Sequence, residues 1–133
     1  MAHQIRLGDI TFANDRPFAL LGGVNVLEDL DFALRCAGHY KDVCGRLNIP
    51  LVFKASYDKA NRSSIHSYRG PGLKDGLQML QAVKDTHGIP VITDVHSPEE
   101  AAPAVQAAAP SQEAQEGTTV SPHLHCQAPF PSQ

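Results

Sequence analysis

The sequence predicts an α/β fold in which strands and helices alternate around a parallel sheet. Three short apolar runs are separated by two longer segments whose apolar residues recur every three or four positions. Polar and charged residues gather directly after each apolar run, at the end of a parallel sheet where α/β folds bind their ligands. The length of 133 residues suits one modest domain with a single core.

The N-terminal residues predict a small hairpin and then a buried strand. Apolar and polar residues alternate over residues 5–11, and Asn14 and Asp15 follow as a turn. Residues 18–21 form a continuous apolar run that ends at Gly22 and Gly23. Because the run has no polar position, we expect a strand that is buried on both faces.

Two segments have helical spacing. In residues 29–47 the apolar positions are Leu30, Ala33, Leu34, Ala37, Tyr40, Cys44 and Leu47. Asp29 suits the positive N-terminal end of this helix, and Pro50 follows its end. In the second helix the apolar positions are Leu73, Leu77, Leu80 and Val83. Gly88 and Pro90 end this second helix.

Two more strands complete the alternation. They are predicted over residues 50–53 and 89–93, and a loop of sixteen residues, 57–72, follows the first of them. A capping serine at Ser97, a proline at Pro98 and two acidic residues then begin another helix.

Composition excludes several classes of protein. Eleven Lys and Arg against fourteen Asp and Glu give a net charge of −3, which argues against a nucleic-acid protein built on net basicity. No apolar run is long enough to span a membrane, and the first residues lack a signal pattern, so we expect a cytoplasmic protein. Cys36, Cys44 and Cys126 lack metal-site spacing and are interpreted as reduced thiols.

The chain changes character near residue 100. All eleven basic residues lie in residues 1–100, and Ala, Pro, Gln and Ser make up 21 of the 33 residues in 101–133. Such a stretch offers little large apolar surface to offset the entropy of ordering it. We therefore expect an ordered portion over 1–100 and a low-complexity, disordered tail over 101–133 with a short helix at its start.

The segment after the second strand contains the residue types that bind phosphate. Its cations, amide and hydroxyls are Lys54, Lys59, Asn61, Arg62, Ser63 and Ser64. Cations supply charge and hydroxyls supply directed hydrogen bonds. A solvated surface loop is the alternative interpretation, but long loops inside compact α/β units tend to be functional.

The other two strand ends also carry polar residues. Asn25 follows the first strand, and Asp94 and His96 follow the third. A turn asparagine and a capped loop start are the simpler interpretations. Because the carboxyl ends of parallel strands share one edge, three such ends together favour a common site.

Several motifs carry a resemblance to one family. The most specific are residues 58–64, Asp-Lys-Ala-Asn-Arg-Ser-Ser, and residues 67–72, Ser-Tyr-Arg-Gly-Pro-Gly, with support from residues 8–10, 13–15, 22–27, 52–56 and 93–96. Over residues 8–96 the chain resembles the N-terminal part of 3-deoxy-D-manno-octulosonate 8-phosphate (KDO8P) synthase. The related 3-deoxy-7-phosphoheptulonate synthases have a Lys-Pro-Arg-Thr type of signature where this chain has Lys-Ala-Asn-Arg. Tyr57, where Phe is usual, is a departure.

The resemblance implies a (β/α)₈ barrel assembled as a homotetramer. The implied enzyme is a transferase of lipopolysaccharide biosynthesis that condenses phosphoenolpyruvate with arabinose 5-phosphate and water and releases phosphate. A full barrel needs roughly 250 residues. The sequence therefore predicts only a partial barrel, with an N-terminal hairpin and the first three βα units.

The resemblance also implies roles for individual residues. Lys54 and Lys59 would bind phosphoenolpyruvate and the reacting centre, and Asp94 would lie near the sugar hydroxyls. Arabinose 5-phosphate would be bound by Asn61, Arg62 and Ser63. Asn25 stands where metal-dependent members have Cys, which indicates a metal-independent enzyme without cofactor.

The family pattern is expected to be lost after about residue 100, followed by unrelated or out-of-frame sequence. We therefore expect the isolated chain to have little or no synthase activity. The alternatives are a phosphosugar-binding portion, a non-functional barrel fragment and, as another enzyme, a related 3-deoxy-7-phosphoheptulonate synthase.

Overall fold

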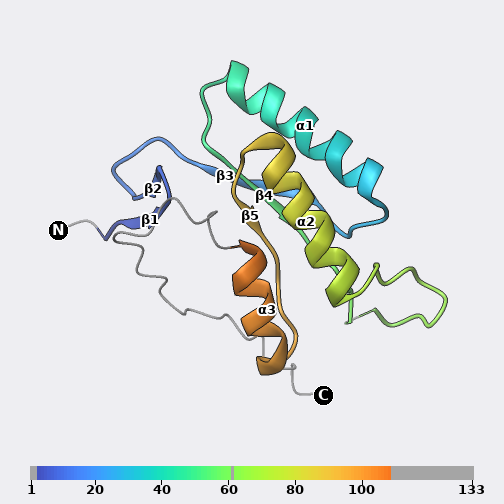
Figure 1. Ribbon diagram of the computed structural model, residues 1–133. Coiled ribbons are helices and arrows are strands. Elements are labelled where there is room, and N and C mark those ends of the chain that lie inside the picture. The colour runs from blue at the N-terminus through green and yellow to red at the C-terminus, as the bar shows by residue number, and fades with distance from the viewer. Residues whose placement is uncertain (1–2, 61, 109–133) are drawn as a thin grey trace.

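The computed structural model describes residues 3–60 and 62–108 (Figure 1). A two-stranded antiparallel hairpin precedes a parallel sheet of three strands in the order β3-β4-β5. The elements, in chain order, are β1 (Ile5–Leu7), β2 (Ile10–Phe12), β3 (Leu20–Val24), α1 (Leu30–Arg46), β4 (Leu51–Ala55), α2 (Leu73–His87), β5 (Val91–Ile92) and α3 (Pro98–Ala108). The predicted α/β class with a parallel sheet is therefore confirmed.

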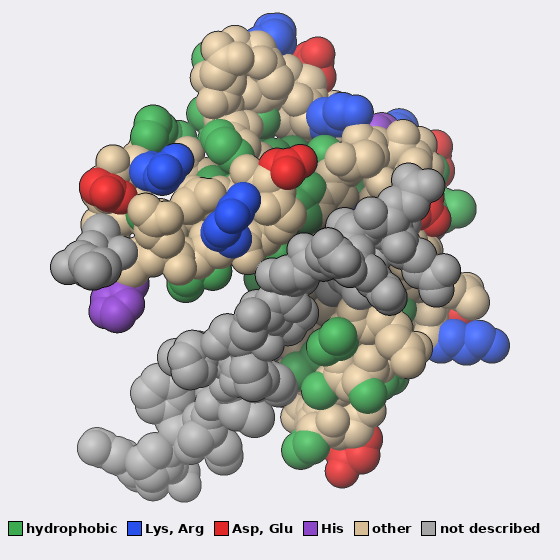
Figure 2. Space-filling view, turned by 60° about the vertical axis from the view of Figure 1, so that its left-hand side comes forward, with side chains coloured by type: hydrophobic (Ala, Val, Ile, Leu, Met, Phe, Trp, Pro, Cys, Tyr) green, Lys and Arg blue, Asp and Glu red, His purple; other side chains and the backbone are tan. Residues whose placement is uncertain are grey.

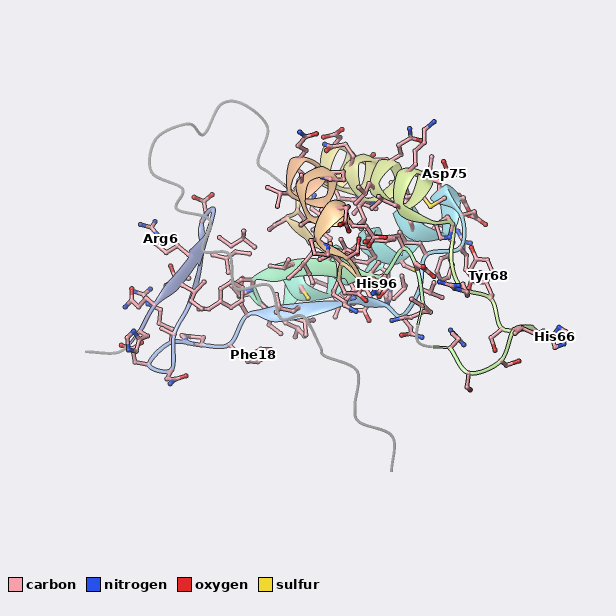
Figure 3. The ribbon with its side chains drawn as sticks, turned by 90° about the horizontal axis from the view of Figure 1, so that it is seen from below. Arg6, Phe18, His66, Tyr68, Asp75 and His96 are labelled. Atoms are coloured by element: carbon pink, nitrogen blue, oxygen red, sulfur yellow. The ribbon has the colours of Figure 1, made fainter. Side chains whose placement is uncertain are left out.

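All three helices lie on one side of the parallel sheet, as the views in Figures 1 and 3 agree. They pack in chain order, α1 against α2 and α2 against α3. The core fills the space between helices and sheet, with Ala33 and Ala37 from α1, Phe53 from β4, and Leu80 and Val83 from α2. The other face of the sheet is not covered by these helices.

The ends of α1 and α2 follow from their local sequence. Asp29 has extended backbone, and its carboxylate accepts a hydrogen bond of 2.8 Å from the backbone N–H of Phe32, which satisfies a free donor at the helix start. Gly88 ends α2 in the left-handed conformation, with φ of 63°. Both helices match their predicted ranges because capping and apolar periodicity indicate the same bounds.

The hairpin forms, and Asn14 and Asp15 form the predicted turn, but that turn follows the hairpin instead of connecting its two strands. Leu7 pairs with Ile10, so Gly8 and Asp9 make the turn, and Gly8 has a φ of 56° that favours glycine. The alternation over residues 5–11 therefore spans both strands of the hairpin.

β3 begins and ends later than expected, and it is not buried on both faces. Phe18 precedes the strand with 66% of its surface exposed, and Leu21 is 52% exposed on the face without helices. Gly22 and Gly23 lie inside the strand instead of ending it. A Cβ on Gly23 would overlap the backbone of Lys54 in β4, so a glycine here allows the two strands to approach.

The last strand is short and the last helix is long. β5 has only two residues, fewer than the five predicted over 89–93. α3 starts at Pro98, directly after Ser97 as expected, and continues past residue 100 to Ala108. Residues 109–133, which hold most of the predicted tail and Cys126, lie outside the described part of the chain.

Figure 2 shows the charged side chains on one face of the molecule. On the face in Figure 2, basic and acidic side chains are interspersed among the described residues. Among the helices that the structure describes, none combines the length and apolar character needed to cross a membrane.

Candidate functional site

The candidate site lies at the C-terminal ends of β4 and β5. In β4, Leu51, Phe53 and Ala55 belong to the core beneath the helices, so the alternation of side chains places Lys54 on the face opposite the helices. Ser56 follows the strand, and Asp94 follows β5 by two residues. The parallel pairing of β4 with β5 brings these strand ends to the same edge of the sheet.

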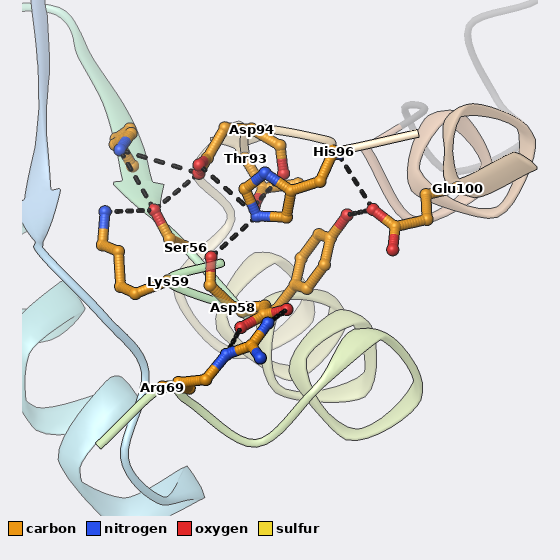
Figure 4. Close-up of polar contacts among 10 residues, drawn as sticks. Ser56, Asp58, Lys59, Arg69, Thr93, Asp94, His96 and Glu100 are labelled. Carbon is orange, nitrogen blue, oxygen red and sulfur yellow. Dashed lines mark hydrogen bonds and ion pairs between the residues drawn. The ribbon is translucent and has the colours of Figure 1, made fainter. Parts of the chain in front are cut away.

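The Ser56 hydroxyl is the centre of the site (Figure 4). Lys59 Nζ donates to Ser56 Oγ at 2.9 Å and Lys54 Nζ donates at 3.3 Å, while the hydroxyl donates to Asp94 Oδ1 at 2.5 Å. Ser56 is fully buried, and its one donor and two acceptor positions are all used. We call Lys54, Ser56, Lys59 and Asp94 the lysine cluster.

Two ammonium groups and one carboxylate leave the lysine cluster with excess positive charge. Lys54 Nζ lies 3.8 Å from Asp94 Oδ1, and the two side chains are 39% and 41% exposed. Partial burial alone would raise the pKa of Asp94, but the Ser56 hydrogen bond, the residue's own backbone N–H and the charges of Lys54 and Lys59 outweigh it and lower that pKa. Asp94 is therefore ionised at neutral pH, and the ammonium groups remain open to an anion.

A second set of bonds fixes the base of the loop that follows β4. Arg69 Nε and Nη2 donate to the two carboxylate oxygens of Asp58 at 2.9 and 2.7 Å. Backbone bonds join Lys59 to Arg69 and Tyr57 to Gly72. These contacts hold Lys59 at the site while the intervening loop extends outward, and His66 marks that outward direction in Figure 3.

The structure brings together only some of the predicted site residues. Lys54, Lys59 and Asp94 converge, as expected from their strand ends. Arg62 and Ser63 are both exposed on the extended loop, and the described contacts do not join either side chain to the lysine cluster. Asn25 is exposed directly after β3. Asn61 lies outside the described residues, so its predicted role stays a prediction.

Sequence reasoning missed the residues that hold the site together. Ser56 was noted only as part of a motif, although a serine directly after a buried strand is well placed to bond across strand ends. The buried Tyr57 donates a hydrogen bond of 2.6 Å to the carboxylate of Glu100, and the sequence pattern did not indicate this bond. The extra hydroxyl of Tyr57, where Phe is usual, was the available signal.

Within residues 3–60 and 62–108, no group of three or more His, Cys, Asp or Glu side chains has an arrangement that fits a metal ion. Cys36 and Cys44 are free thiols on α1. The lysine cluster itself contains two ammonium groups, one hydroxyl and one carboxylate.

A family model matches most of the chain. The family model described as the DAHP synthetase I family matches residues 2–112. This match continues about twelve residues beyond residue 100, so the expectation that the family pattern ends there is wrong, and α3 belongs to the matched region.

Curated relatives carry one name. A protein of Parasynechococcus marenigrum (strain WH8102) is 86% identical over 107 residues, which are 80% of this chain and 38% of the relative. A Prochlorococcus marinus (strain MIT 9313) protein is 74% identical over 105 residues, 79% of this chain and 37% of the relative. A Pseudoalteromonas translucida protein is 59% identical over 102 residues, with 77% and 36% covered. All three are named 2-dehydro-3-deoxyphosphooctonate aldolase.

That name denotes KDO8P synthase, so the resemblance carried by the motifs is confirmed. The chain spans about 38% of the length of the first of these relatives. The match over residues 2–112 covers most of the 133 residues. The chain therefore belongs to the DAHP synthetase I family.

Proposed function

We propose that the described residues form the phosphate-binding strand ends of a KDO8P synthase, which condenses phosphoenolpyruvate with arabinose 5-phosphate. In this transferase reaction, C3 of phosphoenolpyruvate attacks the sugar aldehyde, water adds at C2, and inorganic phosphate leaves. The observation that carries the proposal is the convergence of Lys54 and Lys59 on the Ser56 hydroxyl. Two fixed ammonium groups match the carboxylate and phosphate of phosphoenolpyruvate.

The arrangement of elements supports a partial (β/α)₈ barrel. Consecutive strands β3, β4 and β5 are neighbours in the sheet, and the helices cover one face only. A doubly wound sheet has helices on both faces, whereas a barrel keeps them outside and directs ligands to the C-terminal strand ends. The lysine cluster lies at that end.

The proposal assigns phosphoenolpyruvate to Lys54 and Lys59, and the sugar hydroxyls to Asp94. Arg62 and Ser63, with Asn61, would bind the phosphate of arabinose 5-phosphate from the extended loop. Asn25 is assigned to a reaction without a metal, because its amide is a weak metal ligand compared with a thiolate. A homotetramer, a cytoplasmic location and a role in lipopolysaccharide synthesis stay predictions.

The heptulonate synthase alternative has less support. The relatives at 74 and 86% identity carry the phosphooctonate name. The Lys-Ala-Asn-Arg sequence of residues 59–62 agrees with that name. We therefore keep arabinose 5-phosphate as the sugar substrate.

Calorimetry on the 133-residue chain tests the binding step. Phosphoenolpyruvate should give saturable heat that is lost in Lys54→Met and Lys59→Met, since each variant removes one ammonium group. Lys41→Met is the matched control, because Lys41 lies on α1 and bonds the backbone carbonyl of His87 instead. Saturable binding that survives both cluster variants would contradict the assignment.

Arabinose 5-phosphate tests the loop. Its heat should disappear in Arg62→Ala and persist in Arg46→Ala, a matched arginine that pairs with Asp42 on the surface of α1. A response to both variants would point to non-specific charge.

Turnover is a separate question for this chain. The described residues supply three strand ends of the proposed barrel, so anionic substrates meet only part of the cation ring that the proposal requires. We expect a coupled phosphate-release assay with both substrates to stay at the blank rate. Measurable release by the purified chain would contradict this expectation.

A further inference from the structure

Three consecutive residues after β4 bond to the segment that follows β5. The pairs are Ser56 with Asp94, Tyr57 with Glu100, and Asp58 with His96. The ladder between β4 and β5 covers only two register positions, so it fixes the start of this segment weakly. The position of residues 94–100, and with it the Asp94 carboxylate, therefore depends on these three bonds.

Tyr57 makes the most enclosed of the three bonds. Its side chain is 1% exposed and lies against Gly76 of α2, where a Cβ would overlap the tyrosine Cβ. Its hydroxyl donates to Glu100 Oε2 at 2.6 Å (Figure 4). Burial raises the pKa of Tyr57, and the hydrogen bond from Tyr57 lowers the pKa of Glu100. A neutral donor therefore meets a charged acceptor, which is the stronger class of hydrogen bond.

The position of Glu100 in turn constrains that of His96. Glu100 Oε2 also accepts the backbone N–H of His96 at 2.9 Å. His96 Nε2 lies 2.7 Å from the carbonyl oxygen of Asp58, and because a carbonyl can only accept, Nε2 carries the proton. The His96 ring meets the Tyr57 ring edge-on at 5.8 Å. His96 is thus held at its backbone, its ring face and its Nε2.

We propose that Tyr57 is a positioning residue of the lysine cluster, acting through Glu100 and His96 to hold the segment that carries Asp94. The proposal rests on the anion-binding role proposed above. Tyr57 does not touch the anion. Its hydroxyl fixes the Asp94 carboxylate at the distance where Ser56 accepts from both lysines, which keeps the two ammonium groups together.

Phosphoenolpyruvate affinity of the full chain tests the proposal. Tyr57→Phe keeps the ring and removes the hydroxyl, and we expect it to raise Kd about five- to tenfold. Tyr68→Phe is the matched control, because the Tyr68 hydroxyl, on the exposed loop, donates to the Glu28 carbonyl, and the described hydrogen bonds do not join it to the lysine cluster. Kd should stay at the wild-type value in this control. A purely structural role predicts a lower unfolding midpoint in Tyr57→Phe with an unchanged Kd, and that result would overturn the proposal.

Glu100 variants test the route of the effect. Glu100→Ala should weaken binding as much as Tyr57→Phe, and the double variant should show no further loss, because both changes break one path. Glu100→Gln keeps an acceptor oxygen and should retain most of the affinity. Additive losses in the double variant would contradict a shared path.

A spectroscopic measurement separates this proposal from the proposed function. The Hε1 and Nε2 resonances of His96 should shift in Tyr57→Phe and Glu100→Ala, and stay in place in Tyr68→Phe. A wild-type chain that takes up no phosphoenolpyruvate would defeat the proposed function, while these shifts would still support positioning. An unchanged His96 spectrum in Tyr57→Phe would defeat the positioning role whatever the binding result.

Discussion

Replacing Ser56 by alanine should loosen the lysine cluster and weaken anion binding together. The hydroxyl makes three bonds to charged groups, each of a kind that contributes about 1.5 to 3 kcal/mol. Lys54 and Asp94 are about two-fifths exposed, so water replaces much of what they lose. We therefore expect Ser56→Ala to lower the free energy of unfolding by about 1 to 2 kcal/mol, well below the sum of three bonds.

The assay combines urea unfolding, followed by circular dichroism, with calorimetric titration of phosphoenolpyruvate. Kd should rise about tenfold, because the two ammonium groups lose their shared acceptor. The pKa of Asp94 should rise once the Ser56 bond is gone. Thr86→Ala is the control, since Thr86 is exposed on α2 and a surface change stays within about 0.5 kcal/mol. Equal stability, affinity and Asp94 titration in the two variants would refute the reasoning.

The remaining predictions concern the frame of the site. Gly76→Ala should destabilise the fold by about 1 to 3 kcal/mol, because the new Cβ would overlap Tyr57. Gly45→Ala places its Cβ where no atom lies within 4 Å, and it should stabilise the fold by about 0.5 to 1 kcal/mol. Urea unfolding midpoints measure both changes. Asp29→Ala removes an N-cap and should cost about 1 kcal/mol, measured in the same way. The pKa of Asp94 is lower in the folded chain than in the unfolded chain. The ionised carboxylate therefore stabilises the fold above the unfolded pKa, and this stabilisation is lost as pH falls through the folded pKa. Below about pH 5 the unfolding midpoint of Asp94→Asn should therefore decline less than that of the wild type.

The helices could be predicted from the sequence because local signals are sufficient for them. In α1 the capping carboxylate of Asp29 and the apolar stripe describe the same segment, and Gly88 ends α2 by its conformational freedom. The strands were harder to place. Gly22 and Gly23 indicate the end of a strand by composition, yet they lie within β3, where the backbone of Lys54 approaches Gly23. That approach is a tertiary contact, and no local pattern contains it.

The candidate site also contains some residues that the sequence predicts and one that it does not. Lys54, Lys59 and Asp94 were predicted because each follows or ends a strand, and parallel strands share an edge. The hydroxyl that joins them could not be predicted from composition, since Ser56 bonds a residue 38 positions away. The Ser56 hydroxyl contributes to the site because three charged side chains bond to it, and only the folded chain brings those side chains together.

The two groups of cations in this site differ in how they are held. Lys54 belongs to a strand and Lys59 to a loop base that is closed by the backbone of Arg69, so both ammonium groups are in place before a ligand arrives. Arg62 lies on the exposed part of the loop. Its backbone N–H donates a hydrogen bond to the carbonyl oxygen of Lys59 within the same loop. The fold therefore holds the two lysines in place, whereas the described hydrogen bonds and ion pairs do not hold the Arg62 side chain.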